Sequence, residues 1–159
     1  MKYRTGIGYD VHQLRDGLPF YLGGVKVEHT KGAVGHSDAD VLIHAVCDAL
    51  LGAANLGDIG KHFPDTDVKY KGIDSKILLK ETYELVKKKG YVIENIDTVL
   101  CLQKPKVAPY LPLMKTTLSN VLGINEDDIS IKATTTEHLG FEGREEGVSA
   151  LANVLIKTE

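Results

Sequence analysis

Alternating apolar and polar residues predict two strands at the start of the chain, over Tyr3 to His12 and Pro19 to His29. In the second segment, Val25 and Val27 alternate with charged residues, and a period of two places apolar side chains on one face of a strand. Glycines separate these short extended runs. The first thirty residues therefore favour strands over helices.

The first predicted helix runs from Ser37 to Ala54. Ser37 or Asp38 can cap its N-terminus, and its apolar face has helical spacing, formed by Ile43, Val46, Cys47, Leu50 and Leu51. Because Cys47 falls on this face, we interpret it as a core residue. The polar loop over residues 55–70 is rich in glycine and aspartate, and its length favours a functional role over a simple connection.

Helices and strands alternate through the rest of the chain. We predict four further elements: a helix from Asp74 to Lys89 capped by Asp74 or Ser75, a strand from Tyr91 to Gln103, a helix from Pro109 or Pro112 to Gly123, and a strand from Ile129 to Thr136. The last apolar run, Val148 to Ile156, fits either a strand or a helix. The alternation predicts an α/β or α+β fold, and the absence of linkers and repeats predicts a single domain over residues 1–159.

The composition and charge of the chain argue against several classes of function. Apolar residues make up 43% of the chain and charged residues 26%, which is typical of a globular protein. The net charge of −3 and the pI near 6.1 disfavour nucleic-acid binding. We expect no membrane span, because the longest apolar run is far too short. With two cysteines and no signal-peptide pattern, we expect a reducing, cytoplasmic location.

Acids and histidines gather in two short stretches. Asp10 and His12 are two apart in a predicted strand, so their side chains share a face. A second set recurs every four residues along the predicted helix, which would form a polar stripe: His36, Asp40, His44 and Asp48. Asp10, His12 and His44 together would supply the carboxylate and two imidazoles of a catalytic zinc site with an open position. Spacing alone leaves ordinary surface or core roles equally open.

Three other segments offer weaker signals. The carboxylates of Asp58 to Asp67 could accept hydrogen bonds from ligand hydroxyls, or could belong to an ordinary surface loop. Lys104 and Lys106 follow a strand and could contact a phosphate, or could equally form a plain strand exit. Thr134 to Thr136 could cradle phosphate, and Glu137 could hold Mg²⁺, although threonine runs are also common in plain strands.

The chain resembles the 2-C-methyl-D-erythritol 2,4-cyclodiphosphate synthases of non-mevalonate isoprenoid biosynthesis. The matching motifs span nearly the whole chain: Gly8-Tyr9-Asp10-Val11-His12, Leu22-Gly23-Gly24-Val25, His36-Ser37-Asp38-Ala39-Asp40, Asp48 to Ala54, Leu56 to Gly60, Phe63 to Asp67, Lys132 to Glu137, and Leu139 to Phe141. Tyr9 is a mild departure, because the family commonly has Phe there.

The resemblance implies a phosphorus–oxygen lyase. Members convert 4-diphosphocytidyl-2-C-methyl-D-erythritol 2-phosphate into the cyclic diphosphate and CMP, because the substrate's 2-phosphate attacks its own β-phosphorus. The implied fold is α+β, a four-stranded mixed sheet with helices packed on one face, and Val148 to Ile156 would be a strand. The implied assembly is a homotrimer with active sites between subunits.

The resemblance also assigns roles to residues. Asp10, His12 and His44 would bind Zn²⁺, Glu137 would bind Mg²⁺ or Mn²⁺, and His36 and Thr135 would assist the transition state. Ser37 would lie beside the substrate phosphate, and Asp10, Val11, His12 and His36 would also contact the substrate. The residues that would face the methylerythritol unit are Asp58, Ile59, Gly60, Phe63, Pro64, Asp65, Thr66 and Asp67. The cytidine diphosphate pocket is Leu102, Gln103, Lys104, Pro105, Lys106, Val107, Ala108, Thr134, Thr135, Thr136 and Glu137. Phe141 and Arg144 would line the trimer centre, where some members hold an isoprenoid diphosphate.

Two other functions compete with the cyclase. A zinc-dependent phosphohydrolase of a nucleotide-linked polyol would use the same ligands on water and give an open-chain product. A non-catalytic trimeric binding module would need a closed four-ligand metal site, which Asp10, His12 and His44 alone do not provide.

Overall fold

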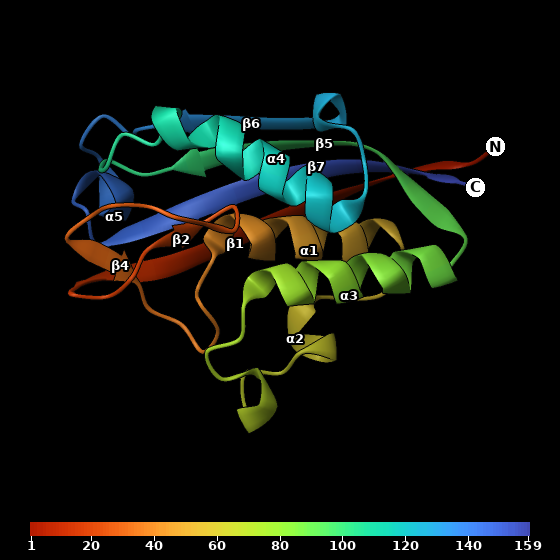
Figure 1. The fold of residues 1–159 in the computed structure, drawn as a ribbon, viewed down its shortest axis with the longest axis horizontal. Helices are drawn as coiled ribbons and strands as arrows, with labels where there is room; N and C mark the ends of the chain where they lie inside the picture. The colour runs from red at the N-terminus through yellow and green to blue at the C-terminus, as the bar shows by residue number, and fades with distance from the viewer.

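A computed structural model describes residues 1–159, and its main sheet has five strands in the order β4-β1-β7-β5-β6 (Figure 1). The strands are β1 (Tyr3–Asp16), β4 (Lys31–Ala33), β5 (Tyr91–Cys101), β6 (Ile129–Thr134) and β7 (Gly147–Thr158). Only the β5–β6 pair is parallel, and the other neighbours are antiparallel. The predicted α+β fold with a mixed sheet is confirmed. The predicted count of four strands is wrong, because the three-residue β4 pairs with the end of β1.

The predicted strand over Pro19 to His29 is also corrected. This segment forms a small hairpin of β2 (Tyr21–Leu22) and β3 (Val25–Lys26) outside the main sheet. Gly23 and Gly24 make its turn with φ angles of 58° and 75°, a left-handed conformation that favours glycine. The turn divides one predicted strand into two.

Three long helices cover one face of the sheet: α1 (Val41–Ala53), α3 (Ser75–Lys88) and α4 (Leu111–Leu122). In Figure 1, α1 and α3 lie below the sheet and α4 crosses in front of β5 and β6. Shorter turns are α2 (Ile59–His62), α5 (Gly140–Gly143), η1 (Val68–Tyr70), η2 (Ala108–Tyr110) and η3 (Glu126–Asp128). The core between helices and sheet is one cluster of 34 buried residues, which includes Cys47 as predicted. None of the helices has the length and apolarity that crossing a membrane requires.

Helix α1 begins four residues later than predicted because Asp40 is its N-cap. The fully buried Asp40 carboxylate accepts hydrogen bonds from the backbone N–H of Ile43 at 3.1 Å, Gly23 at 3.0 Å and Gly24 at 2.7 Å. It therefore ties the β2–β3 turn to the start of α1. The predicted four-residue polar stripe is wrong in its first half, since only His44 and Asp48 are helical.

Glycines allow α1 to lie directly on β1. A Cβ atom on Gly8 would come within 1.9 Å of the Ala45 carbonyl oxygen, and one on Gly6 within 2.0 Å of the Ala49 carbonyl oxygen. Gly6 and Gly8 share a strand face with Asp10 and His12. The close approach of the two backbones thus brings α1, with His44, next to Asp10 and His12.

The opposite face of the sheet carries exposed apolar side chains. Ile7 is 74% exposed, Tyr9 52%, Val11 44% and, on the neighbouring strand β7, Leu151 38%. Tyr9 and Leu151 are direct partners in the β1–β7 ladder. We call these four residues the open sheet face.

Candidate metal centre and substrate cavities

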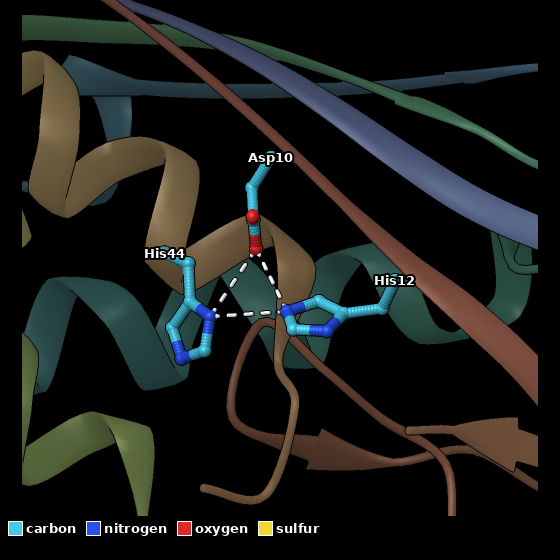
Figure 2. Close-up of side chains that lie close together, drawn as sticks. All are labelled: Asp10, His12 and His44. Atoms are coloured by element: carbon cyan, nitrogen blue, oxygen red, sulfur yellow. Dashed lines mark hydrogen bonds and ion pairs between the residues drawn. The ribbon is translucent and has the colours of Figure 1, made fainter. Parts of the chain in front are cut away.

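Asp10, His12 and His44 converge on one point from β1 and α1 (Figure 2). Asp10 Oδ2 lies 2.9 Å from His12 Nε2 and 3.2 Å from His44 Nδ1. The two ring nitrogens are themselves 3.2 Å apart. The strand parity of Asp10 and His12 and the closeness of α1 to β1 produce this arrangement, and the structure brings the predicted zinc ligands together.

The hydrogen bonds around His12 show that the cluster suits a cation. His12 Nδ1 lies 2.8 Å from the Val34 carbonyl oxygen, which can only accept, so Nδ1 carries a proton. A neutral His12 therefore directs the lone pair of Nε2 at the Asp10 carboxylate. Two acceptors at 2.9 Å need a proton or a metal ion between them. A carboxylate and two imidazoles are a donor set that binds zinc with an open position.

The pKa values of Asp10 and His12 show that this cluster favours a negative carboxylate and positive charge beside it. Burial raises the pKa of Asp10, but its close contacts with the His12 and His44 rings outweigh burial and lower the pKa from 3.8 to about 2. Burial lowers the pKa of His12, yet its contact with Asp10 raises the pKa above its ordinary value overall. Asp10 is therefore ionised at neutral pH, which is the form that binds a metal.

A cavity of about 530 Å³ opens on this cluster. Its lining comes from β1, from the loop before α1, from α1, from the segment over residues 59–73 and from α3: His12, Gly35, His36, Ser37, His44, Ile59, Gly60, Phe63, Pro64, Asp65, Thr66, Tyr70, Ile73 and Leu78. We call it the metal cavity. It includes nine of the thirteen residues between Asp10 and Asp67 that are predicted to contact the substrate.

The other four of these residues lie outside the lining. Asp10 is in the metal cluster, whereas the Val11 side chain is on the opposite face of β1. Asp58 caps α2 by accepting from the Lys61 N–H at 3.0 Å. Asp67 accepts from the Lys69 N–H at 3.0 Å, and its carbonyl oxygen accepts a hydrogen bond from His36 Nε2 at 2.9 Å.

The loop that walls the metal cavity is held to α1 by Asp48. Its carboxylate accepts a hydrogen bond from the Ile59 N–H at 2.7 Å. The hydrogen bond from His36 to Asp67 fixes the other end of the same loop. Asp48 therefore positions the cavity wall and is not part of the ligand cluster.

A second cavity of about 190 Å³ lies where β5 and β6 end. Its lining is Leu102, Gln103, Pro105, Lys106, Val107, Ala108, Ala133, Thr134 and Thr135. We call it the nucleotide cavity, after the predicted cytidine diphosphate pocket. Gln103 Oε1 accepts a hydrogen bond from the His138 N–H at 3.2 Å, which ties the lining segment over residues 102–108 to the chain just after Thr135. The two cavities have no lining residue in common.

Five other predicted residues lie near the nucleotide cavity or beyond it. Lys104, Thr136 and Glu137 are not in its lining; Thr136 donates its hydroxyl proton to the Leu139 carbonyl at 2.6 Å. Phe141, in α5, places its ring against Gly147, and the exposed Arg144 pairs with Glu146 at 2.9 Å.

Comparison with known proteins identifies the family. The YgbB family model matches residues 3–157. The chain belongs to the YgbB family. Curated relatives named 2-C-methyl-D-erythritol 2,4-cyclodiphosphate synthase include that of Bacteroides thetaiotaomicron, 62% identical over the full length of both chains. The synthase of Cytophaga hutchinsonii is 57% identical over 98% of each chain.

Solved structures give the same family and fold. The bifunctional IspDF of Campylobacter jejuni has a TM-score of 0.96 and 44% identity, covering 99% of this chain, which spans 43% of that longer protein. The CDP complex of IspF from Plasmodium falciparum has a TM-score of 0.87 and 34% identity over 99% of this chain and 97% of that one. The YgbB fold therefore extends over this whole chain.

Some residues of the site could not be assigned from the sequence. Tyr70, Ile73 and Leu78 line the metal cavity, and Ser75 contacts His44 at 2.9 Å. The sequence presented Ser75 only as a candidate helix cap. Nothing in its spacing from His44 indicates contact, because the two lie on different helices.

Proposed function

We propose that this protein is a 2-C-methyl-D-erythritol 2,4-cyclodiphosphate synthase, a lyase of isoprenoid biosynthesis, with residues 1–159 acting as one domain. It converts 4-diphosphocytidyl-2-C-methyl-D-erythritol 2-phosphate into the cyclic diphosphate and CMP. The observation that carries this proposal is the convergence of Asp10, His12 and His44 at a cavity, in a chain that matches the named synthases from end to end.

The substrate supplies its own nucleophile, so the protein mainly has to position it. Tethering the 2-phosphate and the β-phosphorus in one molecule removes much of the entropic barrier of a bimolecular step. The walls around Ile59, Phe63 and Leu78 are apolar and would limit access of competing water. Asp65 offers a carboxylate to the hydroxyls of the methylerythritol unit.

Charge neutralisation is the other requirement of phosphoryl transfer, because charge in the transition state lies on the phosphate oxygens. Zn²⁺ held by Asp10, His12 and His44, and Mg²⁺ or Mn²⁺ held by Glu137, would supply Lewis-acid neutralisation of those oxygens. His36 and Thr135 would donate hydrogen bonds to the phosphoryl oxygens. To do so, His36 would give up its hydrogen bond to the Asp67 carbonyl oxygen and donate to the substrate instead.

We infer that the complete active site forms between subunits of a homotrimer. Within one chain the metal cavity and the nucleotide cavity have no residue in common, although one substrate must occupy both. The open sheet face supplies an apolar surface for association. Phe141 and Arg144 would then face the trimer centre, where an isoprenoid diphosphate could bind. The CDP complex of the P. falciparum relative supports the nucleotide part of the proposal.

Phosphorus NMR tests the reaction directly. The purified protein is incubated with the diphosphocytidyl substrate, Zn²⁺ and Mg²⁺, and we expect CMP together with two coupled ring-phosphate signals. CMP with an open-chain phosphate would identify a phosphohydrolase instead. No turnover by a folded, metal-loaded protein would contradict catalysis altogether. His44→Ala protein is the matched negative control.

A further inference from the structure

A chain of hydrogen bonds leads away from the metal cluster behind His44. His44 Nε2, the ring nitrogen that faces away from Asp10, lies 2.9 Å from the Ser75 hydroxyl. The Ser75 hydroxyl in turn contacts Asp38 Oδ1. Ser75 is completely buried, and the His44 side chain is 12% exposed. The three residues come from α1, the first residue of α3 and the loop before α1.

The direction of this chain follows from what each atom can donate. The Ser75 hydroxyl donates to Asp38 Oδ1, because a carboxylate oxygen is the acceptor in this pair. The Ser75 oxygen can then only accept from His44, and Nε2 must carry the proton. His44 Nδ1 is left with its lone pair directed at the Asp10–His12 pair. A serine without Asp38 behind it could donate instead and would favour the opposite tautomer.

Asp38 is itself held firmly. Its Oδ2 accepts from the Ser75 N–H at 3.0 Å and its Oδ1 from the Asp40 N–H at 3.2 Å. The Asp38 N–H donates to the Ile73 carbonyl at 3.1 Å. Asp38 therefore has little freedom to release the Ser75 hydroxyl.

Ser37 is a second hydroxyl near His44 but does not set the tautomer. Its oxygen lies 3.1 Å from His44 Nε2 and also accepts from the Ala39 N–H at 3.1 Å. No carboxylate takes the Ser37 proton, so this hydroxyl can act toward His44 as donor or acceptor. Only the Ser75 contact has a fixed direction.

We propose that Ser75 and Asp38 are positioning residues that hold His44 in the Nε2–H tautomer for metal binding. Partners behind a metal-binding histidine fix its ring and tautomer, and their removal typically lowers metal affinity ~10–100-fold. The inference rests on the proposed function only in taking His44 as a metal ligand. Through Ser75, its first residue, α3 is thereby joined by a hydrogen bond to the metal centre.

Zinc affinity of the full-length protein tests the proposal, measured with Zn²⁺ alone against a chromophoric chelator. We expect Ser75→Ala to bind Zn²⁺ ~10–100-fold more weakly and Ser75→Thr, which retains the hydroxyl, to bind nearly as the wild type does. Ser119→Ala is the matched control. It removes another buried hydroxyl, one that donates to the Ile124 carbonyl at 3.0 Å in α4. Equal Zn²⁺ affinity of Ser75→Ala and wild type would overturn the proposal.

Two further measurements separate positioning from general destabilisation. Asp38→Ala should also weaken Zn²⁺ binding, and the Asp38→Ala/Ser75→Ala double variant should lose little beyond the larger single loss, since both act through one chain. Fully additive losses would contradict this. In zinc-loaded protein, the His44 Nε2 proton should give a protected NMR signal that exchanges rapidly in Ser75→Ala. An unchanged signal would also count against the proposal.

These readouts do not depend on turnover. If wild-type protein binds Zn²⁺ and responds to Ser75→Ala but forms no cyclic diphosphate, the proposed function fails and the positioning role remains. If the cyclic diphosphate forms while Ser75→Ala leaves Zn²⁺ affinity unchanged, only the positioning role fails.

Discussion

Three side chains, Asp10, His12 and His44, bring the metal-binding atoms of this protein together, and each should be individually necessary. We expect His44→Ala to lose Zn²⁺ and nearly all turnover, because two ligands remain where three converged. The fold should persist, since His44 contributes to the cavity wall and not to the apolar core cluster. Metal analysis and phosphorus NMR measure both effects.

The control for this prediction is His138→Ala. His138 is an exposed histidine with no place in either cavity lining, so its loss should leave zinc content unchanged. A His44→Ala protein with full zinc content and rate would remove His44 from the ligand set.

Asp40 is a residue whose role is structural, although it lies among the candidate ligands in the sequence. We expect Asp40→Ala to lower the free energy of unfolding by at least ~3 kcal/mol. The lost cap accounts for ~1 kcal/mol, and the unpaired N–H groups of Gly23 and Gly24 account for ~1–3 kcal/mol each. Denaturant unfolding provides the measurement.

Asp74→Ala offers a matched comparison, because Asp74 caps α3 from a side chain that is 48% exposed. Its removal should lower the free energy of unfolding by only ~1 kcal/mol. Equal losses in the two variants would show that the bonds from Asp40 to the hairpin turn contribute little.

At the residue scale, the sequence predicted the position of a side chain correctly where local backbone geometry alone determines it. The two-residue spacing of Asp10 and His12 was enough to place them on one strand face. The stripe of His36, Asp40, His44 and Asp48 failed in its first half, because the Asp40 carboxylate caps α1 at the Ile43 N–H and also accepts from the N–H groups of the hairpin turn. That contact joins residues far apart along the chain and leaves no periodic signal.

At the scale of elements, the site depends on the direct contact between α1 and β1. We expect Gly8→Ala to destabilise the protein by ~1–3 kcal/mol or more, as overpacking does, because its Cβ would lie 1.9 Å from a backbone oxygen of α1. Any relaxation must move α1 away from β1, so Zn²⁺ affinity should fall as well. Thermal unfolding and Zn²⁺ competition measure the two effects.

Gly52→Ala, within α1 itself, should have the opposite effect. The nearest atom to its added Cβ is 4.0 Å away, and alanine in a helix is favoured over glycine by ~0.5–1 kcal/mol. Similar losses of stability in both variants would mean that close backbone contact is not what Gly8 provides.

The elements themselves were predicted well where periodicity is strong and poorly where it is hidden. The three long helices and the strands β1, β5 and β6 were all expected. The strand β7 stayed ambiguous because its outward-facing positions are apolar as well: Leu151 and the partly buried Leu155 alternate with buried residues, so no alternation of apolar and polar residues is visible. The strand β4 was missed because three residues are too few to show a period.

At the scale of the whole molecule, the separation of the two cavities is the observation behind the proposal that the active site forms between subunits. The metal cavity and the nucleotide cavity use different segments, and the open sheet face leaves apolar side chains exposed. The sequence could not reveal this separation: the metal-cavity residues lie between positions 12 and 78 and the nucleotide-cavity residues between 102 and 135, but position along the chain does not say which residues meet in space. Only the fold shows that they line different cavities.

A mixing experiment tests whether these cavities meet between subunits. His44→Ala damages only the metal cavity and Thr135→Ala only the nucleotide cavity, and removal of one transition-state donor costs ~10²–10³ in rate. Each variant alone should therefore have little activity. When the two are co-expressed in equal amounts and assemble at random, about a quarter of the sites should combine two intact halves in a ring of subunits.

We accordingly expect the mixture to recover about a quarter of wild-type activity, measured as cyclic diphosphate formed per subunit. Mixing the two purified variants without subunit exchange is the control and should recover nothing. If each chain holds a complete site, every site in the mixture carries one of the two defects. Activity no greater than the sum of the separate variants would then place both halves of the site within one chain.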